Sequence, residues 1–273
     1  YTKKGATGVY TGIRNSTAGT IPTASKTGYT FAGWYTASSG GSKVLNADGS
    51  FTGTAVTNYT TTNAWNTTAN QTLYAQYTLN NPATPTISGA QTKIYGVTAT
   101  TLTGATTTSY ASGVTLYYSF GYATTDGGTP SNWTTPSTSD TYTISATEYV
   151  GDRYYSVKVY ATDGTQTTET IASLTSADVL VRINNASLTF DATTNGGTLS
   201  GTGTLYTRTG ATGVYTGVRN STAGTIPTAS KTGYTFNGWY TASSGGSKVL
   251  NADGTFTGTA VSGYTTAAGK WAT

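Results

Sequence analysis

The chain has 273 residues, 67 of them threonine and 22 tyrosine, and it contains no histidine, cysteine or methionine. Without cysteine and histidine it has no disulfide framework, thiol nucleophile, imidazole base or usual zinc ligand, so we expect no metal, no cofactor and no enzyme. Charged residues make up 9% of the chain and its net charge is +4. Such sparse cations exclude a nucleic-acid partner of the common kind.

The same composition favours strands. Threonine, tyrosine, valine and isoleucine are strand formers, and aromatic residues make up 12% of the chain, enough to build hydrophobic cores. No segment approaches the ~20 apolar residues of a membrane span, so we expect no membrane insertion in this segment. The composition therefore predicts an all-β fold.

The first expected strand begins at Tyr29 and includes Phe31, Gly33 and Trp34. Tyr29 and Phe31 fall on one face at a period of two, and Gly33 interrupts the alternation, as at a β-bulge or a close backbone approach. We favour core packing for these four residues over a ligand-binding platform. Downstream, the Asp-Gly pair of residues 46–49 predicts a turn rather than a calcium loop.

A second alternating strand is expected at residues 72–77, Thr-Leu-Tyr-Ala-Gln-Tyr, and a proline-marked junction follows at residues 80–85. Beyond this junction the sequence no longer resembles residues 1–79. At least six short strand candidates, separated by glycine, Asp-Gly and Pro-Ser-Asn clusters, predict a β-sandwich. They are residues 85–88, 93–95, 114–120, 141–144, 155–160 and 177–181.

Residues 151–159, Gly-Asp-Arg-Tyr-Tyr-Ser-Val-Lys-Val, resemble the corner and penultimate strand of an immunoglobulin-like domain. In that resemblance Val157 stands where the family has its second cysteine, with Tyr155 two residues before it. Phe120 or Tyr118 would be the packed aromatic residue of the third strand. The resemblance implies a sandwich core that contains Phe120, Tyr155 and Val157.

Few residues of the middle segment offer chemistry. Glu148 and Asp152 lie at a predicted strand corner, and their spacing does not indicate the facing carboxylates of a glycosidase. One reaction stays open, a Lys-to-Asn or Lys-to-Asp crosslink of the kind that replaces disulfides in surface stalks. Such a crosslink would use Lys158 as the amine and Glu148 as the assisting acid.

The chain then repeats itself. Residues 206–266 match residues 1–61 without a gap at an offset of 205, with seven differences. A strand with the alternating sequence Ala-Ser-Leu-Thr-Phe-Asp-Ala precedes the second copy at residues 186–192 and ends in an Asn-Gly-Gly turn. The first copy lacks this leading strand and the second lacks the closing strand of residues 72–77. We therefore expect the chain to be a window from a longer repetitive polypeptide.

The repeated segment is similar to the Listeria–Bacteroides repeat, a B-repeat-like module of bacterial surface proteins. The similarity rests on Gly-Tyr-Thr-Phe-x-Gly-Trp-Tyr, present at residues 28–35 and 233–240, between the leading strand and the closing Leu-Tyr-Ala strand. It implies a small, mainly β, β-grasp-like module of secreted or wall-attached proteins, with no catalytic residues. The second copy has equivalents of Tyr29, Phe31, Gly33 and Trp34. They are Tyr234, Phe236, Gly238 and Trp239.

These observations predict three domains: a repeat at 1–79 that lacks its first strand, an immunoglobulin-like sandwich at 80–183, and a second repeat at 184–273 that lacks its last strand. We expect a structural segment of a large extracellular protein on a bacterial cell surface, such as an adhesin stalk or a filament. The alternative is an adhesive module that binds a glycan or protein through exposed tyrosine and tryptophan, with Trp133 among them. Expected partners are like chains, or host or cell-surface glycans or proteins.

Overall fold

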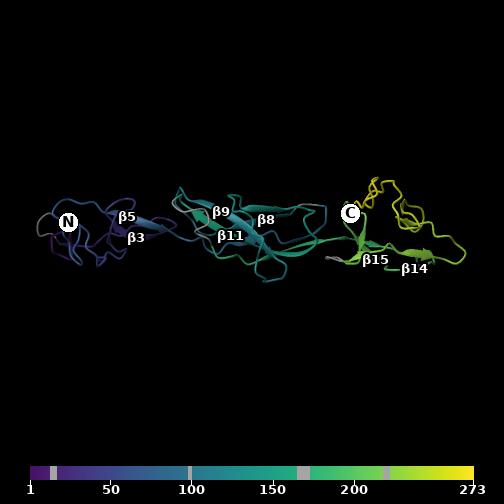
Figure 1. Ribbon diagram of the computed structural model, residues 1–273, viewed down its shortest axis with the longest axis horizontal. Helices are drawn as coiled ribbons and strands as arrows, with labels where there is room; N and C mark the ends of the chain where they lie inside the picture. The colour runs from purple at the N-terminus through teal and green to yellow at the C-terminus, as the bar shows by residue number, and fades with distance from the viewer. Residues whose placement is uncertain (13–16, 98–99, 165–172, 218–221) are drawn as a thin grey trace. The chain divides into compact units, whose positions relative to one another are not determined.

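The computed structural model describes residues 1–12, 17–97, 100–164, 173–217 and 222–273, and this part of the chain contains strands and no helix (Figure 1). None of its elements is a helix that could span a membrane. The all-β prediction is therefore confirmed. The chain divides into two compact units. Residues 1–83, 106–116 and 160–173 form the first, and residues 84–105, 117–159 and 174–273 form the second.

The first copy of the repeat is built around one central strand. Its strands are β1 (Val9–Tyr10), β2 (Ala18–Gly19), β3 (Tyr29–Tyr35), β4 (Lys43–Leu45) and β5 (Tyr74–Leu79). Strand β3 lies between β4 and β5 and is antiparallel to both. The two strands predicted from alternation, at residues 29–35 and 72–77, are thus neighbours in one sheet.

Gly33 causes an irregularity in β3, as its place in the sequence predicts. The register with β5 shifts between Phe31 and Gly33, so that Ala32 has no partner on β5. Gly33 has φ 129°, and a Cβ atom there would lie 2.3 Å from the carbonyl oxygen of Leu45. Only glycine fits both this backbone conformation and this contact.

The middle segment forms two sheets. Its strands are β6 (Thr86–Ser88), β7 (Gln91–Ile94), β8 (Thr100–Ala105), β9 (Thr115–Ala123), β10 (Thr141–Ile144), β11 (Gly151–Thr162) and β12 (Val179–Asn184). One sheet has the order β10-β8-β6 and the other β7-β12-β11-β9. All pairs with a described register are antiparallel except β12 with β7. This is the strand order of an immunoglobulin-like sandwich whose first strand divides between both sheets.

Both sheets of the sandwich contribute to one core. Leu102 and Ile144 come from the first sheet, and Phe120, Tyr155 and Val157 come from the second. All five side chains are at most 3% exposed. The three residues predicted for the sandwich core therefore lie in it.

The second copy of the repeat has more strands before its aromatic segment and fewer after it. Its strands are β13 (Ala186–Thr189), β14 (Thr198–Ser200), β15 (Thr204–Thr207), β16 (Val214–Tyr215), β17 (Ala223–Gly224), β18 (Thr228–Ser230), β19 (Trp239–Tyr240) and β20 (Lys248–Leu250). They form sheets of the orders β13-β15-β16-β17, β14-β18 and β19-β20. The predicted leading strand is β13.

Each copy of the repeat has its own hydrophobic core. In the first copy the buried residues are Val44, Leu45, Val56 and Trp65. In the second they are Phe190, Leu205, Val214, Val249, Leu250, Val261 and Trp271. The repeats and the sandwich thus bury three separate clusters of apolar side chains.

Candidate functional site

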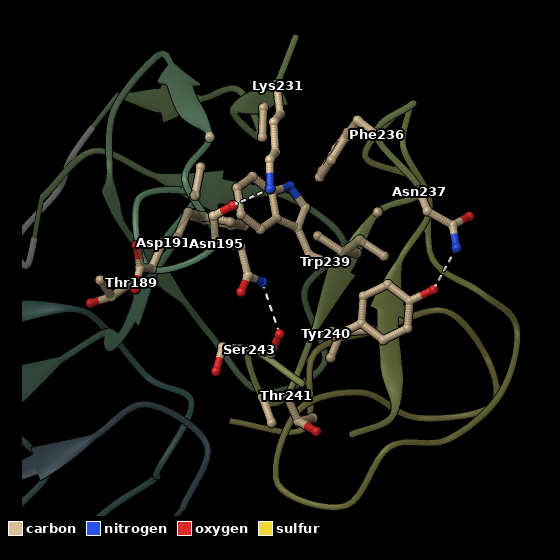
Figure 2. A pocket seen from close by; sticks show the side chains of 18 of the residues that line it. Thr189, Asp191, Asn195, Lys231, Phe236, Asn237, Trp239, Tyr240, Thr241 and Ser243 are labelled. Carbon is tan, nitrogen blue, oxygen red and sulfur yellow. Dashed lines mark hydrogen bonds between the residues drawn. The ribbon is translucent and has the colours of Figure 1, made fainter. Parts of the chain in front are cut away.

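A pocket with a volume of about 760 Å³ lies in the second copy of the repeat. The leading strand and its turn supply one side, including Asp191 and Asn195, and the aromatic segment with the following loop supplies the other. Figure 2 shows Trp239 near the centre of the view, between Asn195 and the segment that carries Phe236 and Tyr240.

The polar groups on the leading side are held by local hydrogen bonds. Asp191 accepts hydrogen bonds from the backbone amides of Thr193 and Thr194 and from their hydroxyls, and these bonds lower the pKa of its carboxyl to about 2. Asn195 donates from Nδ2 to the backbone carbonyl of Ser243 over 2.8 Å. The backbone carbonyl of Asn195 accepts a 2.9 Å hydrogen bond from Nζ of Lys231 (Figure 2). With this pKa, Asp191 stays ionised near neutral pH and does not supply a proton there.

The other side of the pocket is aromatic. The ring of Trp239 lies edge-on to the rings of Phe190 and Phe236, at centroid distances of 4.9 and 5.1 Å. Its Nε1 donates to the carbonyl of Pro227 over 3.1 Å. Trp34 in the first copy does the same toward Pro22, also over 3.1 Å. Each tryptophan is held in place by its own repeat.

The predicted repeat residues occupy different environments in the two copies. Trp34 and Trp239 are half-buried and pack against the cores, and Tyr29 and Phe31 are half-buried beside β5. Phe236 is half-buried as well. Tyr234 was expected in the core but is 70% exposed. Its counterpart Tyr29 lies opposite Leu79 of β5 in the sheet, whereas no strand pairs with Tyr234 among the described residues of the second copy.

Gly238 repeats the geometry of Gly33, with φ 125° and a Cβ position 2.3 Å from the carbonyl oxygen of Leu250. Eight buried residues that occupy equivalent positions in the two repeat cores were not among the predicted ones. They are Val44, Leu45, Val56 and Trp65, with Val249, Leu250, Val261 and Trp271 in the second copy. Two sequence signals present in both copies point to them. One is the apolar Val-Leu pair in the Lys-Val-Leu segment, at residues 43–45 and 248–250, and the other is the tryptophan that follows, Trp65 or Trp271.

The acidic residues of the middle segment have structural partners. Glu148 forms an ion pair with Arg153, whose guanidinium lies 4.0 Å from the ring centroid of Tyr122 and 3.9 Å from that of Tyr149. Asp152 binds Arg182 across strands β11 and β12 through two hydrogen bonds of 2.7 and 2.8 Å. Both carboxylates stabilise the sandwich.

Lys158 and Glu148, the set considered for a crosslink, have different neighbours. The Lys158 ammonium lies 4.5 Å from the ring centroid of Trp133, and the Glu148 carboxylate pairs with Arg153. The cation also covers part of the Trp133 ring, the only tryptophan of the middle segment. The described geometry therefore does not bring Lys158 and Glu148 together for a crosslink. It also leaves the ring of Trp133 partly covered by the Lys158 ammonium.

The turn predicted at residues 46–49 is present. The amide of Gly49 donates to the carbonyl of Asn46 over 3.0 Å, and Asp48 accepts from the amide and hydroxyl of Ser50. These bonds lower the pKa of the Asp48 carboxyl, the hydroxyl bond most. The described residues include no group of three or more acidic side chains arranged to hold a metal ion.

Comparison with protein families identifies the two copies. The model of the Listeria-Bacteroides repeat domain matches residues 1–55 and 187–261. Comparison with curated proteins and with solved structures gives no match. The second matched segment begins in the leading strand and includes both sides of the pocket. The Listeria-Bacteroides repeat model therefore matches both copies, one on each side of a middle region with an immunoglobulin-like strand order.

Proposed function

We propose that this chain is a structural segment of a bacterial adhesin stalk or surface filament. Listeria-Bacteroides repeats occur in bacterial surface proteins, which suggests an extracellular location. The observation that carries the proposal is the presence of two nearly identical copies of this repeat, each with its own core. Repeating modules that fold around separate cores add length to a protein without adding a reaction.

The surface chemistry supports this role. Threonine occupies many solvent-facing strand positions, for example Thr101 and Thr103 on β8 and Thr115 at the start of β9. A β-branched hydroxyl side chain keeps the strand propensity high and leaves the surface polar but uncharged. A stalk with such a surface stays soluble with few charged residues.

Small-angle X-ray scattering of the 273-residue chain tests the proposal. A single compact domain of this length has a radius of gyration of about 19 Å. A stalk segment is expected to give a much larger radius and a pair-distance distribution with a long tail. A radius near the compact value would overturn the proposal.

The alternative, an adhesive module that binds through exposed tyrosine and tryptophan, receives less support from the tryptophans. Trp34 and Trp239 pack against the repeat cores, and Lys158 covers Trp133. Tyr234 and Tyr240 are exposed aromatic residues that line the pocket. A glycan array probed with the chain separates the two functions, because specific glycan binding would favour the adhesive module.

A further inference from the structure

The two sheets of the sandwich have four edge strands in the described part of the chain, namely β6, β7, β9 and β10. An edge strand presents unpaired backbone groups with which another chain can pair. Two of these strands carry a feature that opposes such pairing. Pro85 directly precedes β6 and has no amide hydrogen to donate. Lys93 of β7 lies opposite buried Ile183, so its charged side chain extends from the inward face of the edge.

The edge of β9 is covered by residues 131–137 of the same chain. Three residues of this segment bind the amides and carbonyls that β9 turns outward, over 2.7 to 3.0 Å. The three pairs are Ser137 with Tyr118, Thr134 with Phe120, and Ser131 with Tyr122. The covering segment contains Pro136 and directly follows Pro130, and neither proline can donate to a further strand. The β9 edge is therefore closed to another chain.

The fourth edge strand, β10, pairs with β8 on one side only among the described residues. Next to it, the amide of Gly104 donates to the carbonyl of Asp140 over 2.8 Å. Hydrogen-bonded and non-hydrogen-bonded pairs alternate along an antiparallel ladder. Thr141 and Thr143 therefore turn their amides and carbonyls away from β8, toward the open side of the sheet. Both side chains are exposed.

The hydroxyl of Ser139 occupies the first of these two outward positions. It accepts a hydrogen bond from the amide of Thr141 over 3.2 Å and donates one to the carbonyl of the same residue over 3.0 Å. The amide of Ser139 donates to the hydroxyl of Ser137 over 3.2 Å, which orients the residue. One short side chain thus binds both backbone groups that Thr141 offers to a neighbouring strand.

We propose that Ser139 blocks the β10 edge against antiparallel pairing with the β10 edge of a second copy of this chain. The strand has the sequence Thr-Tyr-Thr-Ile. Two copies related by a two-fold axis at Tyr142 place Thr141 of each copy opposite Thr143 of the other. Each of these two pairs needs the amide and carbonyl of a Thr141. The Ser139 hydroxyl holds those groups in both copies, so both pairs are blocked.

The composition of the chain explains why a hydroxyl has this role. Natural edge strands are usually protected by charged side chains, lysine above all. Only 9% of the residues of this chain are charged, and β10 has none of them. A serine that binds the outward backbone groups protects the edge without adding charge. The proposal concerns association between chains and does not depend on the stalk function.

Sedimentation-velocity ultracentrifugation of the complete 273-residue chain tests the proposal. Ser139→Ala should raise the dimerisation constant about tenfold or more, because it releases the backbone of Thr141. Ser139 is exposed, so the substitution leaves the core intact. Ser139→Thr keeps a hydroxyl at this position and should behave like the natural chain.

Ser145→Ala is the matched control. The hydroxyl of Ser145 accepts from the amide of Thr147 over 3.4 Å in the same way, but Thr147 lies outside any strand. This variant should leave the dimerisation constant within about twofold of the natural value. Adding Thr143→Pro to Ser139→Ala removes the other outward amide and should return the constant to the natural value. Equal association of Ser139→Ala and the natural chain, or an increase that Thr143→Pro leaves unchanged, would overturn the proposal.

A second arm uses a labelled peptide with the sequence of residues 140–145, Asp-Thr-Tyr-Thr-Ile-Ser. By fluorescence anisotropy, it should bind the Ser139→Ala chain about tenfold more tightly than the natural chain. NMR should then show amide shifts at Thr141 and Thr143. Equal affinity for the two chains, or shifts confined to other residues, would contradict the blocking role. The scattering test of the stalk uses the natural chain alone, so either proposal can fail without the other.

Discussion

Thr209 at the start of the second repeat donates a hydrogen bond from Oγ1 to the backbone carbonyl of Tyr95 in the middle region, over 3.1 Å. Its side chain also lies against Gly96, where an added Cβ would come within 2.4 Å of it. Beside it, the Arg208 guanidinium lies 5.3 Å from the ring centroid of Tyr95. The first copy has lysines at both positions, and these account for two of the seven differences. The copies thus differ where the second contacts the middle region.

Thr209→Lys, which installs the first-copy residue, is expected to weaken this contact. The loss of one hydrogen bond costs about 1 kcal/mol, and the longer side chain no longer fits against Gly96. We expect the thermal transitions of the sandwich and of the second repeat to separate or to fall by a few degrees in calorimetry. Thr212→Lys adds the same charge at an exposed position three residues away. Equal effects of the two variants would contradict the prediction.

Gly238→Ala is expected to destabilise the second repeat by about 3 kcal/mol. The backbone there has φ 125°, and a methyl group would lie 2.3 Å from the carbonyl oxygen of Leu250. The measurement is the urea midpoint followed by tryptophan fluorescence. Gly213→Ala is the matched control, because that glycine has no positive φ and no atom within 4 Å of the added methyl. Similar midpoints for the two variants would show that the close approach at Gly238 does not exist in solution.

Part of the fold could be predicted because local sequence patterns indicate it. Gly33 interrupts an alternating aromatic strand, and the structure has a register shift there. Strand β8 was missed for the opposite reason. Its inward positions are Thr100, Leu102 and Gly104, so only one of the three has the apolar side chain that marks a buried face. Gly104 is small because a Cβ there would lie 2.9 Å from Val157 on the facing sheet, a contact that no local pattern reveals.

The candidate site shows a second limit of sequence-based prediction. Tyr29 and Tyr234 lie in identical local sequences, Lys-Thr-Gly-Tyr-Thr-Phe, yet only Tyr234 is 70% exposed. The difference arises from β5, a strand more than 40 residues along the chain in sequence from Tyr29. Local sequence determines which residues can form a strand edge, whereas the covering strand determines whether that edge is buried. The exposure of Tyr234 could therefore not be predicted from its local sequence, because it depends on pairing with a strand distant in the chain.

The stability of the sandwich is expected to fall in alkaline solution. Tyr155 is 1% exposed, and burial is the main cause that raises the pKa of its hydroxyl to about 12. The unfolded chain has a tyrosine pKa of about 10. The folded state therefore retains a proton that the unfolded state loses, so stability is intact below pH 10 and is lost as the pH rises from about 10 to 12.

Urea titrations at pH 8, 10 and 11 measure this loss, which for Tyr155 amounts to about 2–3 kcal/mol at the upper limit. Tyr155→Phe removes the titrating hydroxyl and keeps the ring that packs against Tyr122 and Tyr142. The variant should lose less stability between pH 10 and pH 11 than the natural chain. Identical pH dependence of the two proteins would assign the alkaline loss to other tyrosines.

The intact mass of the chain is expected to equal the mass of its sequence, 28.0 kDa. A Lys-to-Asn crosslink forms an amide between the lysine amine and the side-chain carbonyl carbon and releases ammonia, and a buried acid next to both groups assists the step. Lys158 instead faces the ring of Trp133, and Glu148 is paired with Arg153. Electrospray mass spectrometry of the purified chain checks this expectation. A mass deficit of one ammonia that disappears in the Lys158→Arg variant would show that the crosslink forms and that these side chains rearrange to make it.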